Sequence, residues 1–463
     1  MSRSMRIAVI GSGPSGIYAA DALVSQADVP AEVDIIDRLP VPFGLVRYGV
    51  APDHLSIRSV RDTLDKTLDK PGVRFLGNIT IGSAQDGGDL SVADLHDLYD
   101  AVVFTYGASR DRRLGIDGED LDGSVAATDF VAWYCGHPDA DRELFERLVP
   151  TSTAAVVVGV GNVAVDVARV LGKSVPELDH TDMPQHVFDT LAQSGITDVY
   201  VLGRRGPAQA AWTTKELKEL GELVEADVIV RPEDAVLDEA SAELAASDRA
   251  VGRNVEVIRE WSTRAPEGKP RRVHLRFLSR PVALNGDDRV RTVVVERTRL
   301  TPEGGAEGTG ELEEIAADLV VRSVGYRGTA LDEVPFDAGR NVIPHVDGRV
   351  ERDGEPVAGE YVAGWIKRGP TGIIGTNKKD AVATVASLLD DAANGRLPEP
   401  ANPTAAAVDA LLAERGVAVV STEGWRAIDA AERSLGATRG RARTTIHDRA
   451  ELLTAASGAR SLG

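Results

Sequence analysis

Short apolar runs alternate with helix-like patterns along the first 110 residues. The run Arg6–Ile10 ends at a glycine, and apolar positions spaced for a helix follow over Gly16–Ser25. Val33–Ile36 and Ala101–Thr105 are two further predicted strands. Strands separated by helices favour a parallel sheet with right-handed crossover connections.

The same order of strand, glycine turn and helix begins again in the middle of the chain. Strands are predicted at Ala154–Val158, Asp198–Leu202 and Leu319–Val324, with a helix over Asn162–Leu171. Alternating apolar and polar residues over Gly252–Glu296 predict antiparallel hairpins within this part of the chain.

A third region completes the pattern. It begins with a strand at Tyr361–Ala363, passes through a glycine-rich turn and continues as a helix over about Lys378–Asp391. Pro398–Pro403 interrupts the pattern, and the rest of the C-terminus has helical periodicity. The basic stretch Arg439–Arg443 near the end is predicted to be mobile.

Together these patterns predict an α/β protein with two doubly wound, Rossmann-like dinucleotide-binding domains. Residues 1–108 and 326–463 would form the first domain. Residues 109–325 would form the second domain, inserted between the two halves of the first.

A single cysteine in 463 residues limits the chemistry of the chain. Cys135 can form neither an internal disulfide nor a redox-active dithiol pair, and a small buried residue is the prediction for it. An iron–sulfur cluster needs about four thiolate ligands. Any such cluster must therefore lie on a partner, and no metal site is expected in this chain.

Net charge and hydropathy indicate which partners the protein is expected to bind and where in the cell it is expected. A formal net charge of −20 disfavours binding to nucleic acid and to anionic lipid. No apolar run approaches the roughly 20 residues of a membrane-spanning helix. The N-terminus, Met1–Met5, has no apolar signal region, so a cytoplasmic protein is expected. A monomer is favoured.

The first glycine motif follows the first predicted strand and opens the first predicted helix. Gly11, Gly13 and Gly16 fit G-x-G-x-x-G, which allows a tight turn, a close approach of the backbone to a pyrophosphate, and close packing of helix on strand. The helix N-terminus supplies N–H donors to the phosphates. Asp37 ends the second strand about 20 residues later, where a carboxylate accepts hydrogen bonds from ribose hydroxyls.

The second glycine motif, Gly159–Ala164, fits G-x-G-x-x-A. Its second strand ends in Arg204 and Arg205 in place of an acid. Two guanidinium groups at this position suit a 2′-phosphate, which favours NADP over NAD. The alternative is that the two arginines form surface ion pairs, because their spacing from Gly161 is longer than usual.

Five stretches, in order along nearly the whole chain, resemble the adrenodoxin-reductase type of ferredoxin–NADP⁺ reductases. They are Leu39–His54, Gly159–Asp166, Gly203–Gly206, Thr213–Glu216 and Gly364–Thr376. The resemblance implies FAD and NADP as cofactors and an iron–sulfur ferredoxin as electron acceptor. The chain carries Ser15 where family members often have Ala and Asp37 where they often have Glu, and both changes are chemically mild.

The resemblance also implies site residues. The residues that would contact FAD are Ser15, Asp37, Leu45 and Ile81, with Trp365, Gly372, Ile373 and Ile374 along the flavin ring. The residues that would contact NADP are Val160, Gly161, Asn162, Val163, Arg204, Arg205, Glu216 and Gly372. Backbone N–H groups and the helix dipole at Gly372–Ile374 could stabilise negative charge on the reduced flavin.

His54 and Glu216 are the polar candidates beside the nicotinamide. Hydride transfer from NADPH to the flavin needs no general base, so positioning roles are expected for both. The alternatives are a structural histidine and a glutamate on a solvated helix face.

Three alternative functions share the two glycine motifs. A disulfide reductase would need a cysteine pair, which the chain lacks. An NADPH-dependent flavin monooxygenase leaves no short motif, and a non-catalytic nucleotide sensor would retain both glycine motifs. Residues 249–280 carry nine Lys/Arg and three Asp/Glu, which suggests either a docking surface for an acidic ferredoxin or an ordinary solvated surface.

Overall fold

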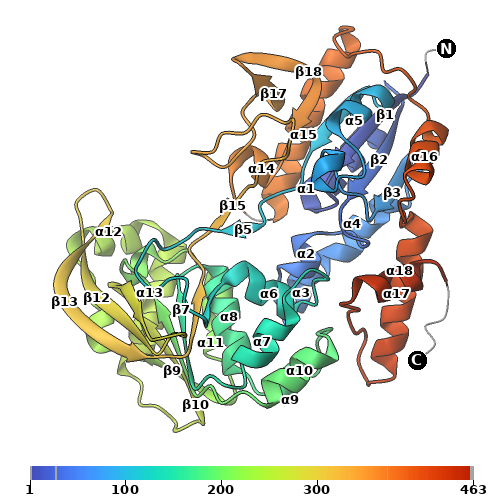
Figure 1. Cartoon of the computed structure of the whole chain (residues 1–463). Coiled ribbons are helices and arrows are strands. Elements are labelled where there is room, and N and C mark those ends of the chain that lie inside the picture. The colour runs from blue at the N-terminus through green and yellow to red at the C-terminus, as the bar shows by residue number, and fades with distance from the viewer. Residues whose placement is uncertain (1–2, 27–28, 373, 459–463) are drawn as a thin grey trace. The chain divides into compact units, whose positions relative to one another are not determined.

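The structure is a computed structural model that describes residues 3–26, 29–372 and 374–458. The chain divides into two compact units, Met1–Arg110 with Tyr326–Gly463 and Asp111–Gly325. Each unit is built on its own β-sheet (Figure 1). The predicted α/β architecture with two dinucleotide-binding folds, one inserted into the other, is confirmed.

The first unit has a seven-stranded sheet in the order β16-β17-β18-β4-β1-β2-β3. Strands β18, β4, β1, β2 and β3 run parallel, while β16 and β17 add an antiparallel edge. Every residue of β1 is buried, as in a central parallel strand covered on both faces. The strands are β1 (Met5–Ile10), β2 (Ala31–Asp37), β3 (Val73–Gly77), β4 (Ala101–Phe104), β16 (His345–Val346), β17 (Arg349–Arg352) and β18 (Glu355–Val362).

Helices cover this sheet and extend beyond it (Figure 1). Apolar side chains of α5 and α16 join Ala8 and Ile10 of β1 in one core, and α1 packs along α15. The helices of the first unit are α1 (Pro14–Ser25), α2 (Leu45–Tyr48), α3 (Leu55–Arg58), α4 (Val60–Leu68), α5 (Val92–Leu98), α14 (Trp365–Arg368), α15 (Ile374–Ala393), α16 (Ala405–Glu414), α17 (Thr422–Ala437) and α18 (Arg449–Ala456).

The second unit has an all-parallel six-stranded sheet in the order β6-β14-β7-β8-β10-β9. A separate antiparallel sheet, β11-β12-β13, packs its apolar side chains against Val156 and Val158 of β7. The strands are β6 (Ser124–Ala126), β7 (Ala154–Val158), β8 (Asp198–Leu202), β9 (Ala226–Val230), β10 (Arg271–Arg276), β11 (Ser279–Asn285), β12 (Thr292–Leu300), β13 (Ala306–Ala316) and β14 (Leu319–Arg322). The segments that link the two units form the short pair β5 (Arg110–Asp111) and β15 (Tyr326–Arg327).

The prediction of antiparallel hairpins over Gly252–Glu296 is only partly correct. Residues up to Thr263 belong to helix α13, whose buried Val255, Ile258 and Trp261 recur at helical spacing. Strand β10 then pairs in parallel with β8 and β9, and only β11 and β12 form an antiparallel pair. The helices of this unit are α6 (Ala127–Tyr134), α7 (Arg142–Leu148), α8 (Asn162–Gly172), α9 (Val175–Leu178), α10 (Gln185–Ala192), α11 (Thr214–Leu220), α12 (Glu239–Ser247) and α13 (Arg249–Thr263).

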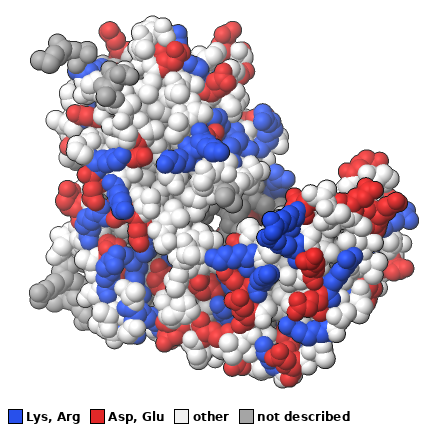
Figure 2. Space-filling model, turned by 180° about the vertical axis from the view of Figure 1, so that it is seen from behind, with Lys and Arg blue, Asp and Glu red and all other residues white. Residues whose placement is uncertain are grey.

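The excess of basic residues over 249–280 does not form a uniform basic patch. Arg272 pairs with Asp198 at 2.5 Å, Arg280 pairs with Glu296 at 2.6 Å, and Arg276 pairs with a glutamate of β13. These acids lie outside the counted segment, so they offset part of its charge. Basic and acidic side chains are intermixed on the face shown in Figure 2. The structure therefore favours an ordinary charged surface here.

The prediction of a mobile stretch at Arg439–Arg443 was wrong for its last residue. Arg443 is buried, and its guanidinium contacts the carboxylates of Glu432 and Asp429. Cys135 is buried, as predicted. No helix among the described residues is long and apolar enough to cross a membrane.

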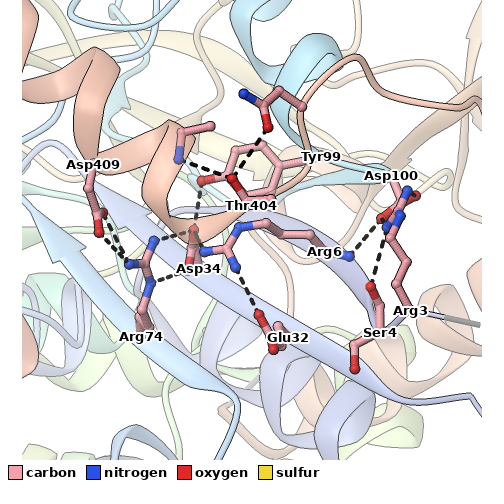
Figure 3. Close-up of polar contacts among 12 residues, drawn as sticks. Arg3, Ser4, Arg6, Glu32, Asp34, Arg74, Tyr99, Asp100, Thr404 and Asp409 are labelled. Carbon is pink, nitrogen blue, oxygen red and sulfur yellow. Dashed lines mark hydrogen bonds and ion pairs between the residues drawn. The ribbon is translucent and has the colours of Figure 1, made fainter.

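A buried carboxylate joins several elements of the first unit (Figure 3). Asp34 of β2 accepts hydrogen bonds from Arg6 at 2.5 Å, from Arg74 at 2.8 and 2.9 Å, and from the Tyr99 hydroxyl at 2.8 Å. Arg74 also reaches the exposed Asp409 of α16 at 3.1 Å. The cluster therefore connects three neighbouring strands to a C-terminal helix.

Replacement of Asp34 by asparagine should destabilise the first unit. Removing one partner of a buried ion pair leaves uncompensated charge, so we expect a loss of about 3 kcal/mol in the free energy of unfolding. Asp409→Asn is the matched control, because an exposed ion pair contributes about 0–1 kcal/mol. Urea unfolding curves for both variants test this, and equal small losses would contradict it.

Asp111, at the start of the second unit, should make stability depend on pH. Burial raises the pKa of its carboxyl to about 6, although the Thr128 backbone N–H donates to it at 2.8 Å. The pKa in the unfolded chain is about 4, so the folded state gains stability as pH falls from about 6 to 4. Relative to Asp111→Asn, the wild-type protein should gain about 1 kcal/mol between pH 7 and pH 5. Parallel stability profiles of the two proteins would refute this assignment.

Candidate functional site

The first glycine loop connects β1 to α1, and two of its glycines are required by close packing. A Cβ atom at Gly16 would lie 1.9 Å from the carbonyl oxygen of Gly11, and a Cβ atom at Gly11 would lie 2.8 Å from the Tyr106 Cα. The helix therefore starts directly against the loop, and its first N–H groups face the loop opening.

Gly13 is different, because neither its backbone nor its packing requires glycine. Its φ of −67° suits any residue, and an added Cβ would meet no other atom within 4 Å. The space in front of the α1 N-terminus is therefore open. Open space beside the N–H groups of a helix N-terminus is suited to a pyrophosphate.

Asp37 lies at the end of β2, beside the same loop. Its Oδ2 atom accepts hydrogen bonds from the backbone N–H of Ser12 at 2.7 Å and from the Ser12 hydroxyl at 2.5 Å. The Leu39 N–H donates to Oδ1 at 2.9 Å. Ser12 was not predicted from the sequence, since it occupies a variable position of the motif. The carboxylate is held in place and remains only partly buried, as a ribose ligand requires.

Residues 39–48, here called loop 39–48, lie against the glycine loop. The Phe43 N–H donates to the Ser12 carbonyl at 3.0 Å, and a Cβ atom at Gly44 would lie 3.1 Å from the Gly13 Cα. Leu45 follows as the first residue of α2. Ile81, another predicted FAD contact, is buried in the apolar core shared with α5 and α16.

His54 immediately precedes α3 and is 3% exposed. Its backbone N–H donates to the Ala51 carbonyl at 3.0 Å. A buried histidine between α2 and α3 suits either a structural or a positioning role, and its role stays a prediction.

Trp365 begins α14 directly after β18. Gly364 lies against α1, because a Cβ there would be 2.2 Å from the Ser15 hydroxyl. Asp380 of α15 accepts from the Gly364 N–H at 2.5 Å and from Lys367 at 2.9 Å, which fixes this turn. The indole Nε1 of Trp365 is buried and has no hydrogen-bond partner among the described residues. A polar ligand group beside this ring would satisfy it.

The predicted flavin-side turn precedes α15. Gly372 has a φ of +84° and is exposed, and Ile374 is the first residue of the helix. Ile373 lies outside the described residues. Asn377, one turn into α15, accepts a hydrogen bond from Arg368 at 2.5 Å and is buried.

The second glycine loop connects β7 to α8 and repeats the features of the first. Gly161 has an extended backbone with φ −107°, and an added Cβ would meet no atom within 4 Å. The segment before α11 braces this loop. The Ala211 N–H donates to the Val160 carbonyl at 2.8 Å, and the Thr213 N–H donates to Asn162 Oδ1 at 2.9 Å.

Arg204 and Arg205 follow β8, as predicted. Their backbone carbonyls accept hydrogen bonds from Thr298 at 2.7 Å and from Leu278 at 3.1 Å. Arg204 is exposed and Arg205 is partly buried. Within residues 3–26, 29–372 and 374–458, neither guanidinium forms an ion pair, so the structure does not support surface ion pairs as the role of these arginines.

Glu216 lies in the first turn of α11, beside the segment that braces the second glycine loop. It is 6% exposed, and the Thr213 hydroxyl donates to its carboxylate. The alternative of a solvated helix face is therefore wrong. Within the second unit, the structure brings together Gly161, Asn162 and Glu216 through Thr213.

Two open glycine loops, each after a parallel strand, define the class of nucleotide-dependent oxidoreductases with paired dinucleotide-binding folds. Residues 5–201 match the family described as pyridine nucleotide–disulphide oxidoreductase. The chain has one cysteine, so the dithiol chemistry in that description is not available to it.

Relatives that match over nearly their full length show which subfamily the chain belongs to. It is 43% identical to NADPH-ferredoxin reductase FprA of Mycobacterium tuberculosis, over 97% of this chain and 99% of the relative. It is 38% identical to mitochondrial NADPH:adrenodoxin oxidoreductase of Arabidopsis thaliana, over 98% and 96% of the two chains. A solved structure of M. tuberculosis FprA in complex with NADPH superposes with a TM-score of 0.91 at 42% identity, covering 98% of this chain and all of the other. The chain belongs to the adrenodoxin-reductase type of ferredoxin–NADP⁺ reductases.

Proposed function

We propose that the chain is an NADPH:ferredoxin oxidoreductase that holds FAD in its first unit and NADP in its second. Bound FAD would supply the redox chemistry, namely hydride acceptance from NADPH and one-electron transfer to an iron–sulfur acceptor. The observation that carries this proposal is the difference between the two strand ends. A fixed carboxylate, Asp37, ends the first, whereas two guanidinium groups without acidic partners among the described residues follow the second.

The first unit supplies the groups that FAD needs. The loop around Gly13 leaves room for the pyrophosphate, and Asp37 is positioned by Ser12 to accept from the ribose. The unsatisfied Nε1 of Trp365 provides a donor for the flavin end of the molecule. Backbone N–H groups at the start of α15 would hold negative charge there.

The second unit supplies the groups that select and orient NADP. Gly161 opens the pyrophosphate site, and Arg204 and Arg205 would bind the 2′-phosphate. The buried carboxylate of Glu216 would accept a hydrogen bond from the nicotinamide carboxamide. His54 stays the other candidate for positioning the nicotinamide or relaying a proton.

The ferredoxin partner is inferred from the NADPH-ferredoxin and NADPH:adrenodoxin reductases that the chain resembles. A chain with one cysteine cannot supply the roughly four thiolates of an iron–sulfur cluster, so any such cluster would lie on the partner. A monomeric state and a cytoplasmic location stay predictions.

Steady-state assays with a purified iron–sulfur ferredoxin test the proposal. NADPH oxidation should depend on ferredoxin, proceed without oxygen, and be much slower with NADH. Oxygen-dependent NADPH consumption with stoichiometric oxygenation of an organic substrate would instead indicate a flavin monooxygenase. A colourless protein without flavin would exclude both.

A further inference from the structure

The C-terminal helix α17 contacts loop 39–48 through a fully buried ion pair. Arg47 is 1% exposed, and its guanidinium donates to both carboxylate oxygens of Glu432, which is 0% exposed. A two-point contact of this kind fixes the orientation of the arginine as well as its position. Glu432 thus determines where α2 lies.

Other groups hold Glu432 itself in place. Arg443 donates to its Oε2 atom at 2.7 Å, and the Ile446 N–H donates to Oε1 at 2.9 Å. Each oxygen of the carboxylate therefore has two donors, one of them from loop 39–48. The carboxylate cannot move without breaking contacts on the C-terminal side.

A second contact joins α17 to the same loop at Phe43. The ring of Phe43 meets that of Trp425 edge to face, with centroids 5.6 Å apart. Phe43 has a φ of +85°, a conformation that is costly for a bulky residue. The surrounding structure must stabilise this conformation, and the buried Trp425 ring is one of the groups that contact Phe43.

Helix α17 has its own attachments away from the loop. Val420, just before the helix, exchanges backbone hydrogen bonds of 2.8 and 3.0 Å with Gly77 at the end of β3. The Trp425 Nε1 donates to Asp65 of α4 at 3.0 Å. The helix is thus fixed to the sheet and to α4, and it can act as a rigid support for loop 39–48.

Loop 39–48 is the part of the chain that closes on the glycine loop, through Phe43 and Ser12 and through Gly44 and Gly13. We propose that α17 is the retaining element of the FAD site, with Glu432 and Trp425 as positioning residues that hold loop 39–48 against the glycine loop. This inference rests on the proposed binding of FAD to the first unit.

The rate of FAD release from the full-length holoprotein tests the inference. It can be followed by the rise in flavin fluorescence after dilution. In Glu432→Gln we expect release to become about tenfold faster or more, because breaking a buried ion pair is strongly destabilising and would free loop 39–48 to move away from the glycine loop. The visible circular dichroism of the bound flavin should also change. Phe43→Leu, which removes the second contact without altering charge, should speed release in the same direction.

Asp391→Asn is the matched control. Asp391 is a buried carboxylate of the same unit that also binds two arginines, Arg349 and Arg396, but it lies at the far end of α15 from the flavin-side turn. Its FAD release rate should stay within about twofold of wild type. Thermal unfolding of all three variants shows whether each protein is folded at the assay temperature.

The FAD release rates of the variants test the inference, and the FAD content of the wild-type protein tests the proposed function separately. Fast FAD release in Glu432→Gln and Phe43→Leu, but not in Asp391→Asn, supports the inference, and Phe43→Leu decides alone if Glu432→Gln does not fold. Wild-type release rates in both Glu432→Gln and Phe43→Leu would overturn it, as would equal acceleration in Asp391→Asn. Wild-type protein that binds no FAD would instead refute the proposed function.

Discussion

Replacing Arg204 and Arg205 together by glutamine should lower kcat/KM for NADPH by about 100-fold or more and leave that for NADH nearly unchanged. A charge-assisted hydrogen bond contributes about 1.5–3 kcal/mol, and two such bonds to a 2′-phosphate would be lost. NADH carries no phosphate at that position, so the substitutions remove nothing that it uses. The wild-type preference for NADPH should largely disappear.

Flavin reduction by each coenzyme over a range of concentrations measures this change. Arg299→Gln is a suitable control, since this exposed arginine of the second unit pairs with Glu307 on the antiparallel sheet. It should leave both kcat/KM values close to wild type. If the double variant lost activity equally with NADPH and NADH, the two arginines would not be reading the phosphate.

Gly161→Val should abolish NADPH binding while leaving the fold intact. The backbone at Gly161 is extended with φ −107°, and a Cβ atom there meets no protein atom within 4 Å. The valine side chain would instead fill the space proposed for the pyrophosphate. We expect the Kd for NADPH to rise by about 100-fold or more, since the phosphates could no longer approach the backbone.

Isothermal titration with NADP⁺ tests this, and the same samples provide internal controls. FAD content should match wild type, because the first unit is untouched, and the melting temperature should change by only a few degrees. Gly161→Ala should give a smaller loss of affinity in the same direction. A valine variant that bound NADP⁺ as well as wild type would show that the second glycine loop is not the pyrophosphate site.

The sequence predicted those parts of the fold that repeat locally. Each glycine loop lies between a strand and a helix that follow one another directly, so Gly13 and Asp37 could be located from spacing alone. Strand β8 was predicted with its observed bounds, Asp198–Leu202. Asp37 and the two arginines, Arg204 and Arg205, indicate which coenzyme each site binds. They lie within about 50 positions of their glycine motifs, so local spacing was enough to locate them.

Contacts between distant parts of the chain could not be predicted in this way. Glu432 is 385 residues from Arg47, and no local pattern marks it as the partner of a buried arginine. The burial of Arg443 was not predicted for the same reason. A run of arginines is typical of a solvent-exposed segment, and no local pattern marks the acidic partners that bury it. Helix α13 was missed because its apolar residues lie among many charged ones, where alternation and helical spacing are hard to separate over a short window.

Anaerobic mixing of the purified protein with NADPH, followed by oxidised ferredoxin, shows whether electrons pass from NADPH through the flavin to ferredoxin. We expect NADPH to bleach the flavin absorbance and NADH at the same concentration to do so far more slowly. Added ferredoxin should then become reduced and restore the flavin absorbance. A flavin that stays oxidised with NADPH, or one that stays reduced when ferredoxin is added, would show that the protein is not an NADPH:ferredoxin oxidoreductase.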